Sequence, residues 1–431
     1  MHDILTGKRL LILGGNRLSC EIVKQAKLMG LVVAVTDYFP KEKSPGKQIA
    51  DESYEVSTID IDAAVRLIKE KCFDGVLTGF TDMLLPYYAE ICQKAGLPSY
   101  GTKEQFETFI DKAKYKELCR RFDVPTVDDY HVDDGGLDAS KIRYPVLVKP
   151  ADSSGSRGIT VCYNDKELFV AIQKAKEVSK EKSVLIERYL TGREVTVFWL
   201  FIDGKYYLTA IGNRHVKHNQ GDDVIPLPVG YTYPASITPK YRAEIEENVK
   251  RMFRYAGIKN GMMFMQCKVE NDVCIVYDIG FRLTGSLEYI NLEAVCGYNP
   301  LEMMIRFAVT GKMTEENIED KICPETMKPS FNVSCLAKPG TIADIDGIDQ
   351  VRNFPEVLDV VMAHYPGENI TEQMRGLLAQ ITVRVLGTVD SKERLFGAMH
   401  RIENAVHILS TEGEEMRLPG IEVNDMEGLI R

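Results

Sequence analysis

The chain has 431 residues, of which 45% are hydrophobic and 27% are charged. This length has room for roughly two to four domains, and the composition excludes a fibrous or wholly disordered protein. With 53 Lys and Arg against 63 Asp and Glu, the formal net charge is −10. The acidic surplus argues against a general nucleic-acid or acidic-membrane binder, because contacts to many phosphates need surplus cations. A local cationic pocket stays compatible with this charge.

The ten cysteines form no Cys-x-x-Cys pair, and the seven histidines do not group around them. Zinc sites and a disulfide framework are therefore disfavoured, and this many thiols suits the reducing cytosol. The start, Met1-His2-Asp3-Ile4, lacks a basic segment followed by a long apolar run, and no stretch of about 18 apolar residues occurs later. We expect a soluble cytoplasmic protein.

The N-terminal segment alternates between strand and helix patterns. Apolar runs at 9–14, 31–36 and 75–78 each end in a turn, and a helical pattern follows the first run. This alternation predicts a parallel sheet with right-handed crossovers. The first turn, Gly14-Gly15-Asn16, is not a complete Gly-x-Gly-x-x-Gly motif. A structural turn is therefore favoured over a dinucleotide site.

The pattern changes after residues 97–101, where one charged helix is predicted over 103–121. From residue 144 onward β-rich runs predominate, with one helix predicted over 239–256. The sequence has no internal repeat and no low-complexity tract. We predict three segments of mixed α/β and α+β structure: an open α/β domain at 1–108, a domain at 109–325 with a subdomain at about 125–186, and an α+β domain at 326–431.

Lys149 ends an apolar strand that begins at Tyr144, and a loop of small residues follows it at 151–158. Within that loop, Gly155 and Gly158 permit backbone angles closed to other residues and can bring successive N–H groups close to an anion. The stretch fits a phosphate-binding loop with a lysine beside it. Taken alone, it fits an ordinary hairpin with a solvent-reaching lysine better.

A break between two strands follows, with Glu187-Arg188-Tyr189-Leu190 before it and Gly192-Arg193-Glu194 after it. Such a break exposes one backbone C=O and one N–H, which can pair with an adenine edge. Glu194 could accept hydrogen bonds from ribose hydroxyls. This segment too would be a plain hairpin if it stood alone.

Apolar runs at 261–269 and 273–278 flank Glu270-Asn271-Asp272 and predict a hairpin. With a three-residue loop, Gln266 is diagonal to Asp278 on one face, at roughly 7–8 Å between backbones. A hard cation could bind there, because Mg²⁺ accepts carboxylate and amide oxygens. A two-residue loop would place the pair on opposite faces and remove the site. Capping of the strand by Asp278 is the structural alternative.

Together these residues resemble the ATP-grasp superfamily of carboxylate–amine ligases and biotin-dependent carboxylases, over about residues 5–310. The resemblance implies an ATP-grasp fold behind an open parallel-sheet domain that helps to hold substrate. The early phosphate-binding lysine of the family corresponds to Lys112 in Asp111-Lys112-Ala113-Lys114, and the lysine before the lid to Lys149. It further implies a lid at Ser153, Ser154, Gly155, Ser156 and Gly158, an adenine hinge at Glu187, Tyr189 and Leu190, and Glu194 as the ribose acid.

The resemblance supports Gln266 and Asp278 as ligands of Mg²⁺ or Mn²⁺, yet the chain departs from the family motif Glu-x-Asn-x-Arg. It reads Asp278-Ile279-Gly280-Phe281-Arg282, so the acid is one methylene shorter and Gly280 has no side chain to act as a ligand. Water molecules, or residues further on, are candidates to compensate: Ser286, Glu288 and Asn291. Arg282 keeps the family's arginine position, where a planar guanidinium can bind a carboxylate or acyl phosphate.

A second cationic cluster, Arg214-His215-Val216-Lys217-His218, is expected in a loop after a strand, before a polar stretch at 219–234. Arg214 is the preferred cation for the transferring phosphate. A solvated basic turn is an equally good interpretation of His215, Lys217 and His218. Arg282, Lys149 and Arg214 are thus the predicted catalytic residues.

The resemblance implies an ATP-dependent carboxylate–amine ligase. A small carboxylate would take the γ-phosphate of ATP, and an amine would then displace phosphate, with two amino acids as candidate substrates. A bicarbonate-phosphorylating carboxylase or carbamoyl-phosphate-synthase-like enzyme is one alternative, and a non-catalytic nucleotide-binding protein is another.

The expected partners are small molecules and a second copy of the chain, with no nucleic acid and no membrane. The C-terminal segment is similar, more loosely, to the L-amino-acid ligase and biotin-carboxylase-like branch.

Overall fold

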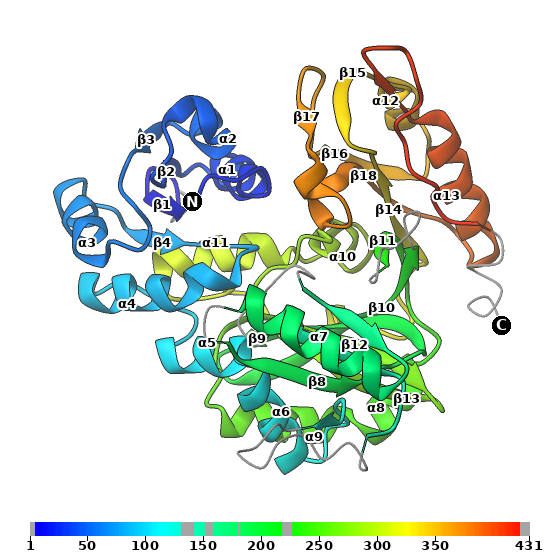
Figure 1. Cartoon of the computed structure of the whole chain (residues 1–431). Helices are drawn as coiled ribbons and strands as arrows, with labels where there is room; N and C mark the ends of the chain where they lie inside the picture. The colour runs from blue at the N-terminus through cyan, green and yellow to red at the C-terminus, as the bar shows by residue number, and fades with distance from the viewer. Residues whose placement is uncertain (1–4, 131–141, 151–157, 180–181, 218–225, 423–431) are drawn as a thin grey trace.

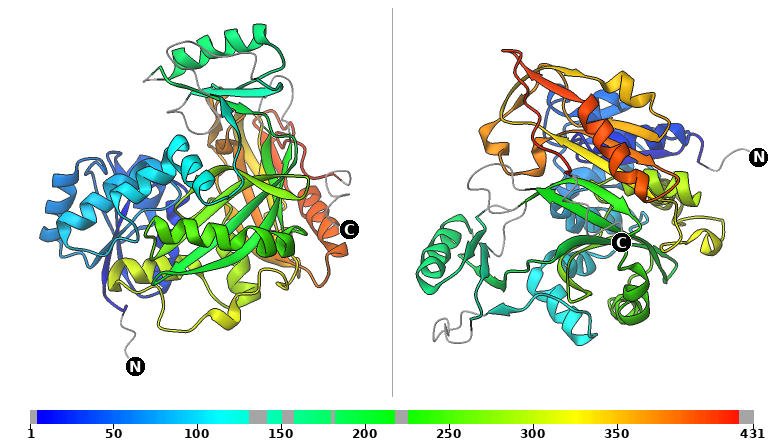
Figure 2. Two further views of the ribbon diagram at one scale, coloured as in Figure 1. Left: turned by 90° about the horizontal axis from the view of Figure 1, so that it is seen from below. Right: turned by 90° about the vertical axis from the view of Figure 1, so that its right-hand side faces the viewer.

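The computed structural model describes residues 5–130, 142–150, 158–179, 182–217 and 226–422. Three lobes meet around a central sheet: an N-terminal lobe, a C-terminal lobe, and a middle lobe from which a small sheet with one helix stands off (Figures 1 and 2). This mixed architecture confirms the predicted fold class of α/β and α+β layers. The boundaries proposed between the segments stay a prediction.

The N-terminal lobe is built on a parallel sheet in the order β3-β2-β1-β4, as the alternating pattern predicted. In the turn after β1, the Gly15 amide donates to Asp37 Oδ2 at 2.9 Å, and Lys47 Nζ lies 2.9 Å from Asp37 Oδ1. The chain's own side chains therefore occupy this turn, as in the structural interpretation. The strands are β1 (Arg9–Leu13), β2 (Val32–Thr36), β3 (Glu52–Tyr54) and β4 (Gly75–Leu77).

One face of this sheet is covered by a helix from much later in the chain. α11 (Pro300–Thr310) packs against β4 and β1. The approach is so close that a Cβ on Gly75 would stand 2.1 Å from the Ala308 carbonyl oxygen. The helices of the N-terminal segment are α1 (Ser19–Leu28), α2 (Pro45–Ile49), α3 (Ile61–Glu70) and α4 (Leu85–Ala95), with short 3-10 turns η1 (Lys41–Lys43) and η2 (Asp82–Leu84).

The single helix predicted over 103–121 is wrong: two helices form, α5 (Lys103–Ile110) and α6 (Lys112–Arg121). They separate because Asp111 has an extended backbone and its carboxylate accepts hydrogen bonds from the amides of Ala113 and Lys114. This is the geometry of a helix N-cap. The break places Lys112 at the first position of α6.

The predicted helix over 239–256 is likewise two helices, α8 (Thr238–Glu244) and α9 (Glu246–Tyr255). The backbone of Ile245, between them, departs from helical angles with φ −120°. Both helices lie against the strands of the middle lobe (Figure 1).

A small sheet in the order β5-β8-β6-β7 carries one helix, α7 (Asp165–Val178), and has its own apolar core. Its core residues come from three strands and one face of the helix, among them Val146, Leu168 and Ile186. Figure 2 shows this unit projecting from the rest of the molecule. The strands are β5 (Asp129–Tyr130), β6 (Val146–Pro150), β7 (Thr160–Cys162) and β8 (Val184–Arg188).

The central sheet has eight strands in the order β13-β12-β9-β10-β11-β14-β18-β16, so it continues across residues 325 and 326 into the C-terminal segment. α10 (Glu288–Cys296) packs on β14, β16 and β18 of this sheet. The strands are β9 (Arg193–Ile202), β10 (Lys205–Lys217), β11 (Leu227–Tyr233), β12 (Gly261–Glu270), β13 (Val273–Gly280), β14 (Ser330–Leu336), β16 (Val357–Met362) and β18 (Ile381–Thr388).

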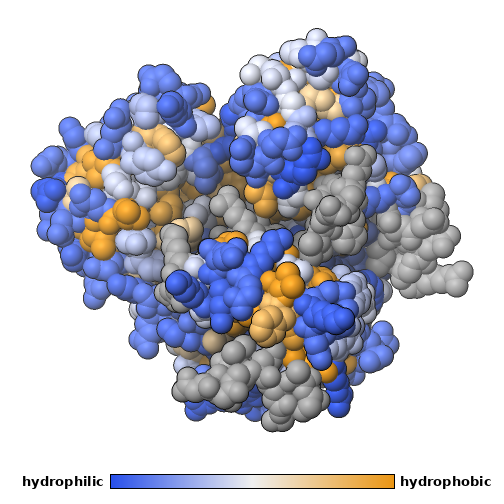
Figure 3. Space-filling view, viewed as in Figure 1, coloured by the Kyte–Doolittle hydropathy of each residue, from blue (hydrophilic) through white to orange (hydrophobic). Residues whose placement is uncertain are grey.

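A second C-terminal sheet, in the order β17-β15-β19, completes the C-terminal lobe around its own core. Its elements are β15 (Gly340–Asp346), β17 (Asn369–Ile370), β19 (His407–Ser410), α12 (Ile348–Arg352) and α13 (Glu393–Ala405), with η4 (Glu319–Lys321), η5 (Glu372–Met374) and η6 (Leu378–Gln380). Among the described residues, no helix is long and apolar enough to cross a membrane. Hydrophilic residues dominate the face in Figure 3, with smaller apolar areas between them.

The cap of α6 gives a first prediction. Asp111→Ala should lower the free energy of unfolding by about 1 kcal/mol, because two amides at the start of α6 lose their acceptor. Denaturant unfolding followed by circular dichroism measures the change. The matched control is Glu117→Ala, an exposed position within the same helix, which should stay within about 0.5 kcal/mol of wild type. Equal stability of Asp111→Ala and wild type would contradict the capping role.

Candidate functional site

A buried ion cluster joins α6 to the small sheet. Lys149 Nζ on β6 lies 2.6 Å from Glu187 Oε2 on β8, and Lys116 on α6 is bound to the other carboxylate oxygen. Lys116 is fully buried, and Glu187 is 4% exposed. Burial opposes the ionisation of Glu187, but the two lysines outweigh it and hold the pKa of this carboxyl below its usual value. Two cations therefore share one carboxylate, and Lys116 also lies 3.7 Å from Asp129 Oδ2.

Lys112 adds a further cation to this region. Burial lowers the pKa of the Lys112 ammonium, and the charge of Lys149 acts in the same direction, while Asp278 and Glu187 oppose them. Groups on α6, β6, β8 and β13 are thus within electrostatic reach of one another. The structure brings together predicted residues that are far apart in the sequence.

Glu194, at the start of β9, lies in a second ion cluster. Its carboxylate binds Arg214 of β10, lies 3.0 Å from Lys268 Nζ of β12, and accepts a hydrogen bond of 3.1 Å from the Tyr277 hydroxyl. Arg214 and Glu194 face each other across neighbouring strands, as do Lys268 and Glu194. Burial acts against the charge of Glu194, but Arg214 and Lys268 keep the pKa of the carboxyl below its usual range.

The loop of the metal-site hairpin differs from the prediction. Glu270 pairs with Val273, so the loop has two residues, Asn271 and Asp272, both with positive φ. This is the loop length that was expected to place Gln266 and Asp278 on opposite faces. The pair nevertheless stands directly opposite in register, because the pairing shifts between Gln266 and Cys267 and leaves Tyr277 as an extra residue. A β-bulge of this kind restores the shared face.

Asp278 is surrounded by charge. Burial raises the pKa of its carboxyl, and Asp82 acts in the same direction, while Lys112, Lys149 and Arg282 act against it. Among the described residues, no group of three or more His, Cys, Asp or Glu side chains is placed to hold a metal ion. A cation at Asp278 would therefore take part of its ligands from other groups, such as the Gln266 amide oxygen, backbone oxygens or water.

Gly280 stands where the family motif has an asparagine, and the packing around it explains why no side chain is present. A Cβ at this position would stand 2.3 Å from the ring of Phe264, which faces Gly280 across the hairpin. The same ring lies 5.0 Å beneath the guanidinium carbon of Arg282. Phe264 thus fills the space into which a side chain at 280 would project, and it supports Arg282 by a cation–π contact.

Arg282 connects the central sheet to the N-terminal lobe. Its Nε and Nη2 atoms each donate to an oxygen of Asp82 at 2.7 Å, and Nη1 donates to the Leu283 carbonyl at 2.9 Å. Asp82 lies in η2, just beyond β4. A bidentate pair of this kind fixes the plane and direction of the guanidinium.

The basic cluster at 214–218 was expected in a loop, but β10 extends to Lys217 and β11 begins at Leu227 inside the stretch predicted to be irregular. The strands pair from Asn213 to Lys217, so the cluster is held in the sheet. Successive side chains of a strand point to opposite faces. Accordingly Arg214 binds Glu194, whereas the buried His215 lies 2.9 Å from Thr232 Oγ1 through its Nε2. His218 lies outside the described residues.

Of the predicted hinge, Glu187 lies within β8 and pairs with Lys116 and Lys149, whereas Tyr189 and Leu190 follow the strand directly. The Tyr189 amide donates to the Pro145 carbonyl at 3.0 Å, and Leu190 is buried. A Cβ on Gly192 would stand 2.1 Å from the Val269 carbonyl, so this close crossing of β12 requires a glycine. Of the predicted lid, Gly158 has a φ of +73°, whereas Ser153, Ser154, Gly155 and Ser156 lie outside the described residues.

Four residues of these clusters were not predicted from the sequence: Lys116, Lys268, Tyr277 and Asp82. Lys116 carries a usable signal, because it lies one helical turn after Lys112 and shares its face. Lys268 also shares a face with Gln266 in a period-2 strand. The orientation of Tyr277 depends on a bulge, and that of Asp82 on the contact between two lobes, so neither has a local signal.

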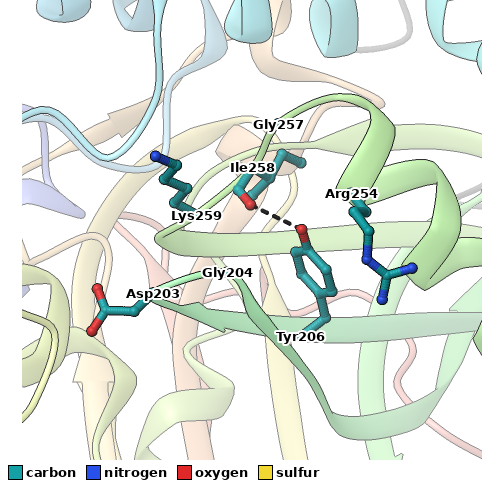
Figure 4. A pocket seen from close by; sticks show the side chains of 7 residues that line it. All are labelled: Asp203, Gly204, Tyr206, Arg254, Gly257, Ile258 and Lys259. Carbon is teal, nitrogen blue, oxygen red and sulfur yellow. Dashed lines mark hydrogen bonds between the residues drawn. The ribbon is translucent and has the colours of Figure 1, made fainter.

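A surface hollow of about 430 Å³ lies elsewhere, at the turn between β9 and β10 (Figure 4). The Tyr206 hydroxyl donates to the Ile258 carbonyl at 3.1 Å beside it. Glu194 is at the opposite end of β9, about 30 Å away along the strand. The hollow is therefore separate from the ion clusters. Its lining is Asp203, Gly204, Tyr206, Arg254, Gly257, Ile258 and Lys259.

The chain has detectable relatives in sequence. A carbamoyl phosphate synthase large chain from Clostridium botulinum (strain Langeland / NCTC 10281 / Type F) is 25% identical over 280 residues, which is 63% of this chain and 26% of that protein. The chain thus spans about a quarter of the length of this relative. A family model described as the ATP-grasp domain matches residues 142–287.

Solved structures share the fold over almost the whole chain. An L-amino acid ligase from Bacillus licheniformis superimposes with a TM-score of 0.76 at 20% identity, covering 94% of this chain and 99% of that one. The biotin carboxylase domain of a Hydrogenobacter thermophilus 2-oxoglutarate carboxylase, solved with MgADP and bicarbonate, gives a TM-score of 0.77 at 18% identity, covering 96% and 92%. Residues 142–287 thus match the ATP-grasp domain model, and the fold of the whole chain is the one seen in these solved structures.

Proposed function

We propose that the chain is an ATP-dependent carboxylate–amine ligase. The observation that carries the proposal is the convergence of Lys112, Lys149 and Arg282 on Asp278, all within electrostatic reach. Cations gathered around a partly buried carboxylate suit a triphosphate with its metal ion. The MgADP-bound biotin carboxylase domain and the L-amino acid ligase, which share this fold, support the assignment of ATP and Mg²⁺.

Under this proposal the nucleotide lies between the small sheet and the central sheet. Lys112 and Lys149 would bind its phosphates, and the hinge at Tyr189 and Leu190 would pair with adenine. Glu194 would accept hydrogen bonds from ribose while Arg214 and Lys268 hold it ionised. The lid at Ser153, Ser154, Gly155, Ser156 and Gly158 would supply amides to the phosphates.

Gln266 and Asp278 fit a hard cation, because they face each other across a strand pair and no described side chain donates a hydrogen bond to the Asp278 carboxylate. Mg²⁺ bound there would neutralise phosphate charge while it keeps several water ligands. Phe264 excludes a side-chain ligand at Gly280. We therefore propose fewer protein ligands per metal than the family motif provides.

The proposed reaction has two steps. A carboxylate oxygen of the first substrate attacks the γ-phosphorus, the bond to the β-phosphate oxygen breaks, and ADP leaves an acyl phosphate. The amine nitrogen of the second substrate then attacks the acyl carbon, phosphate leaves, and the nitrogen loses its extra proton. The chain's part is to hold attacker and leaving group in line and to neutralise the phosphoryl oxygens with Lys112, Lys149 and Arg282. Lid amides that exclude water would protect the acyl phosphate.

A bicarbonate-phosphorylating enzyme is the second candidate. The similarity to carbamoyl phosphate synthase large chains favours it. The two candidates differ in their first substrate. Phosphate release from MgATP that depends on added bicarbonate would identify this alternative, whereas release that depends on an organic carboxylate and an amine supports the ligase. MgATP binding without phosphate release under either condition would indicate a non-catalytic nucleotide-binding protein.

We further propose a cytoplasmic location, because all ten cysteines are free thiols in the structure. A homodimer stays a prediction that sedimentation can test.

Lys149→Ala should lower turnover by roughly two to three orders of magnitude, as the loss of one transition-state charge partner does elsewhere. Phosphate release from MgATP with pooled carboxylates and amines measures it. Lys176→Ala, an exposed lysine of α7 in the same subdomain, is the matched control and should keep wild-type turnover. Wild-type turnover in Lys149→Ala would remove this residue from the mechanism.

Glu194→Gln should weaken MgADP binding and also destabilise the fold by about 3 kcal/mol at pH 7, because Arg214 and Lys268 lose their buried counter-charge. The pKa of Glu194 is depressed in the folded state, so its stabilisation is present above the unfolded pKa and disappears as the pH falls through the folded value. The stability difference from wild type should therefore shrink below about pH 4. A difference that stays constant with pH would contradict the ion cluster.

Asp278→Asn should raise the Mg²⁺ concentration needed for half-maximal phosphate release at least about tenfold, since metal affinity depends on carboxylate charge. Titration with Mg²⁺ at saturating ATP measures this requirement. Asp272→Asn, in the exposed loop of the same hairpin, should leave it unchanged. An unchanged Mg²⁺ requirement in Asp278→Asn would refute the proposed metal site.

A further inference from the structure

A buried arginine of the C-terminal segment has no counter-ion in the described part of the chain. Arg384 on β18 is 8% exposed, and its Nη1 donates to Ser334 Oγ at 2.9 Å. Within that part of the chain, no carboxylate lies at ion-pair distance from its guanidinium. Burial lowers the pKa of Arg384, and the nearby charge of Arg214 acts in the same direction. A guanidinium held in this way is a receptor for an anion.

Glu288, the first residue of α10, is the complementary group. Its side chain is almost fully buried, and Oε2 accepts a hydrogen bond of 2.8 Å from Ser286 Oγ. Among the described residues, Oε1 has no hydrogen-bond partner, and the same holds for the Tyr233 hydroxyl and Asn291 Oδ1. Burial raises the pKa of Glu288 to about 7. A buried carboxylate with an unpaired oxygen is costly unless a ligand satisfies it.

The two groups approach the same face of the central sheet. Arg384 is opposite Ser334 in the strand register, and Asn332, two residues earlier, shares that face. The Asn332 amide donates to the Ser286 carbonyl, which holds the start of α10 against the sheet. Glu288 is also among the charges that act on Arg384. The opposite charges are thus near each other, yet they form no direct pair.

This place is continuous with the proposed nucleotide site. The strand register connects Asn332 to Tyr231, Tyr231 to Arg214, and Arg214 to Glu194. A molecule between Arg384 and Glu288 would therefore lie on the same sheet face as the Glu194 cluster, further toward the C-terminal lobe. Leu287, just before Glu288, is buried with a φ of +60°, a conformation that costs a non-glycine residue energy and is common at functional sites.

We propose that Arg384 and Glu288 bind the two ends of a zwitterionic α-amino acid, Arg384 with Ser334 holding its carboxylate and Glu288 its ammonium. This inference rests on the proposed ligase function and names the amine-supplying substrate. The carboxylate held by Arg384 is not the one that is phosphorylated, so the amino acid enters the reaction through its nitrogen, after the ammonium has given one proton to the Glu288 carboxylate. One small molecule bound between the Arg384 guanidinium and the Glu288 carboxylate explains why these two groups form no direct ion pair.

The test is equilibrium dialysis of the full chain with a mixture of the twenty radiolabelled standard L-amino acids, in the presence of MgADP. Wild type should retain at least one labelled amino acid. Arg384→Met and Glu288→Gln should each weaken retention about 10- to 100-fold, the effect of losing one charge-assisted contact. The matched control Arg352→Met, an exposed arginine of α12, should retain the label as wild type does.

Displacement of the label by two mixtures of analogues tests the two ends of the ligand separately. Amino-acid methyl esters lack the carboxylate and N-acetyl amino acids lack the ammonium, so neither should displace the label as well as free amino acids do. Arg384→Lys keeps the charge without the planar fork, so it should bind the amino acid with intermediate strength. This variant replaces Arg384→Met in the test if Arg384→Met does not unfold cooperatively. Equal displacement by either mixture would overturn the assignment.

MgADP affinity, measured by calorimetry on the same samples, distinguishes this inference from the proposed function. It should be unchanged in Arg384→Met and Glu288→Gln. Retention of MgADP without any amino acid by wild type refutes the inference alone, whereas loss of MgADP binding in wild type refutes the proposed function. A rise in the Mg²⁺ requirement of Glu288→Gln would make Glu288 a metal ligand and would also overturn the inference.

Discussion

The sharing of Glu187 by Lys116 and Lys149 is the contact on which the proposed site depends. It fixes α6 to β6 and β8, so the helix that begins with Lys112 keeps a defined position relative to the small sheet. Lys116 also lies 3.7 Å from Asp129 Oδ2, so two carboxylates face the two buried lysines, and Lys112 adds a further cation nearby for the phosphates of the proposed nucleotide. Removal of Glu187 would leave the buried Lys149 without its counter-charge and Lys116 with Asp129 alone, and an uncompensated buried charge is strongly destabilising.

The sequence was sufficient to predict the fold class, the likeness of residues 142–287 to the ATP-grasp domain and most strands of the middle lobe, because these depend on local apolar patterns and on a motif set with fixed order. It failed where a side chain overrides the pattern. Asp111 breaks a helix that periodicity alone would continue, and the bulge at Tyr277 corrects a register that loop length alone would reverse. The Asp82–Arg282 pair could not be predicted from the sequence either, because it joins two lobes that no local pattern connects.

The neighbourhood of Gly280 shows how one substitution is accommodated by its surroundings. The Phe264 ring fills the space beside Gly280 and also supports Arg282. A side chain restored at position 280 would collide with that ring unless Phe264 moved, so the two positions are coupled. The absence of a side chain at position 280 and the support of Arg282 are therefore parts of one arrangement, and neither can be judged from the motif alone.

The central sheet explains how substrate choice and nucleotide binding can be combined in one element. Its strands β9 to β13 carry the Glu194 cluster and the hairpin of Asp278, whereas β14 and β18 carry Ser334 and Arg384. The hydrogen-bonded register therefore ties groups from the C-terminal segment to those proposed to bind ATP. Changes in β14 or β18 can alter what the chain binds while the ion clusters stay in place. In this way a fold shared with an amino acid ligase and a biotin carboxylase domain can serve different substrates.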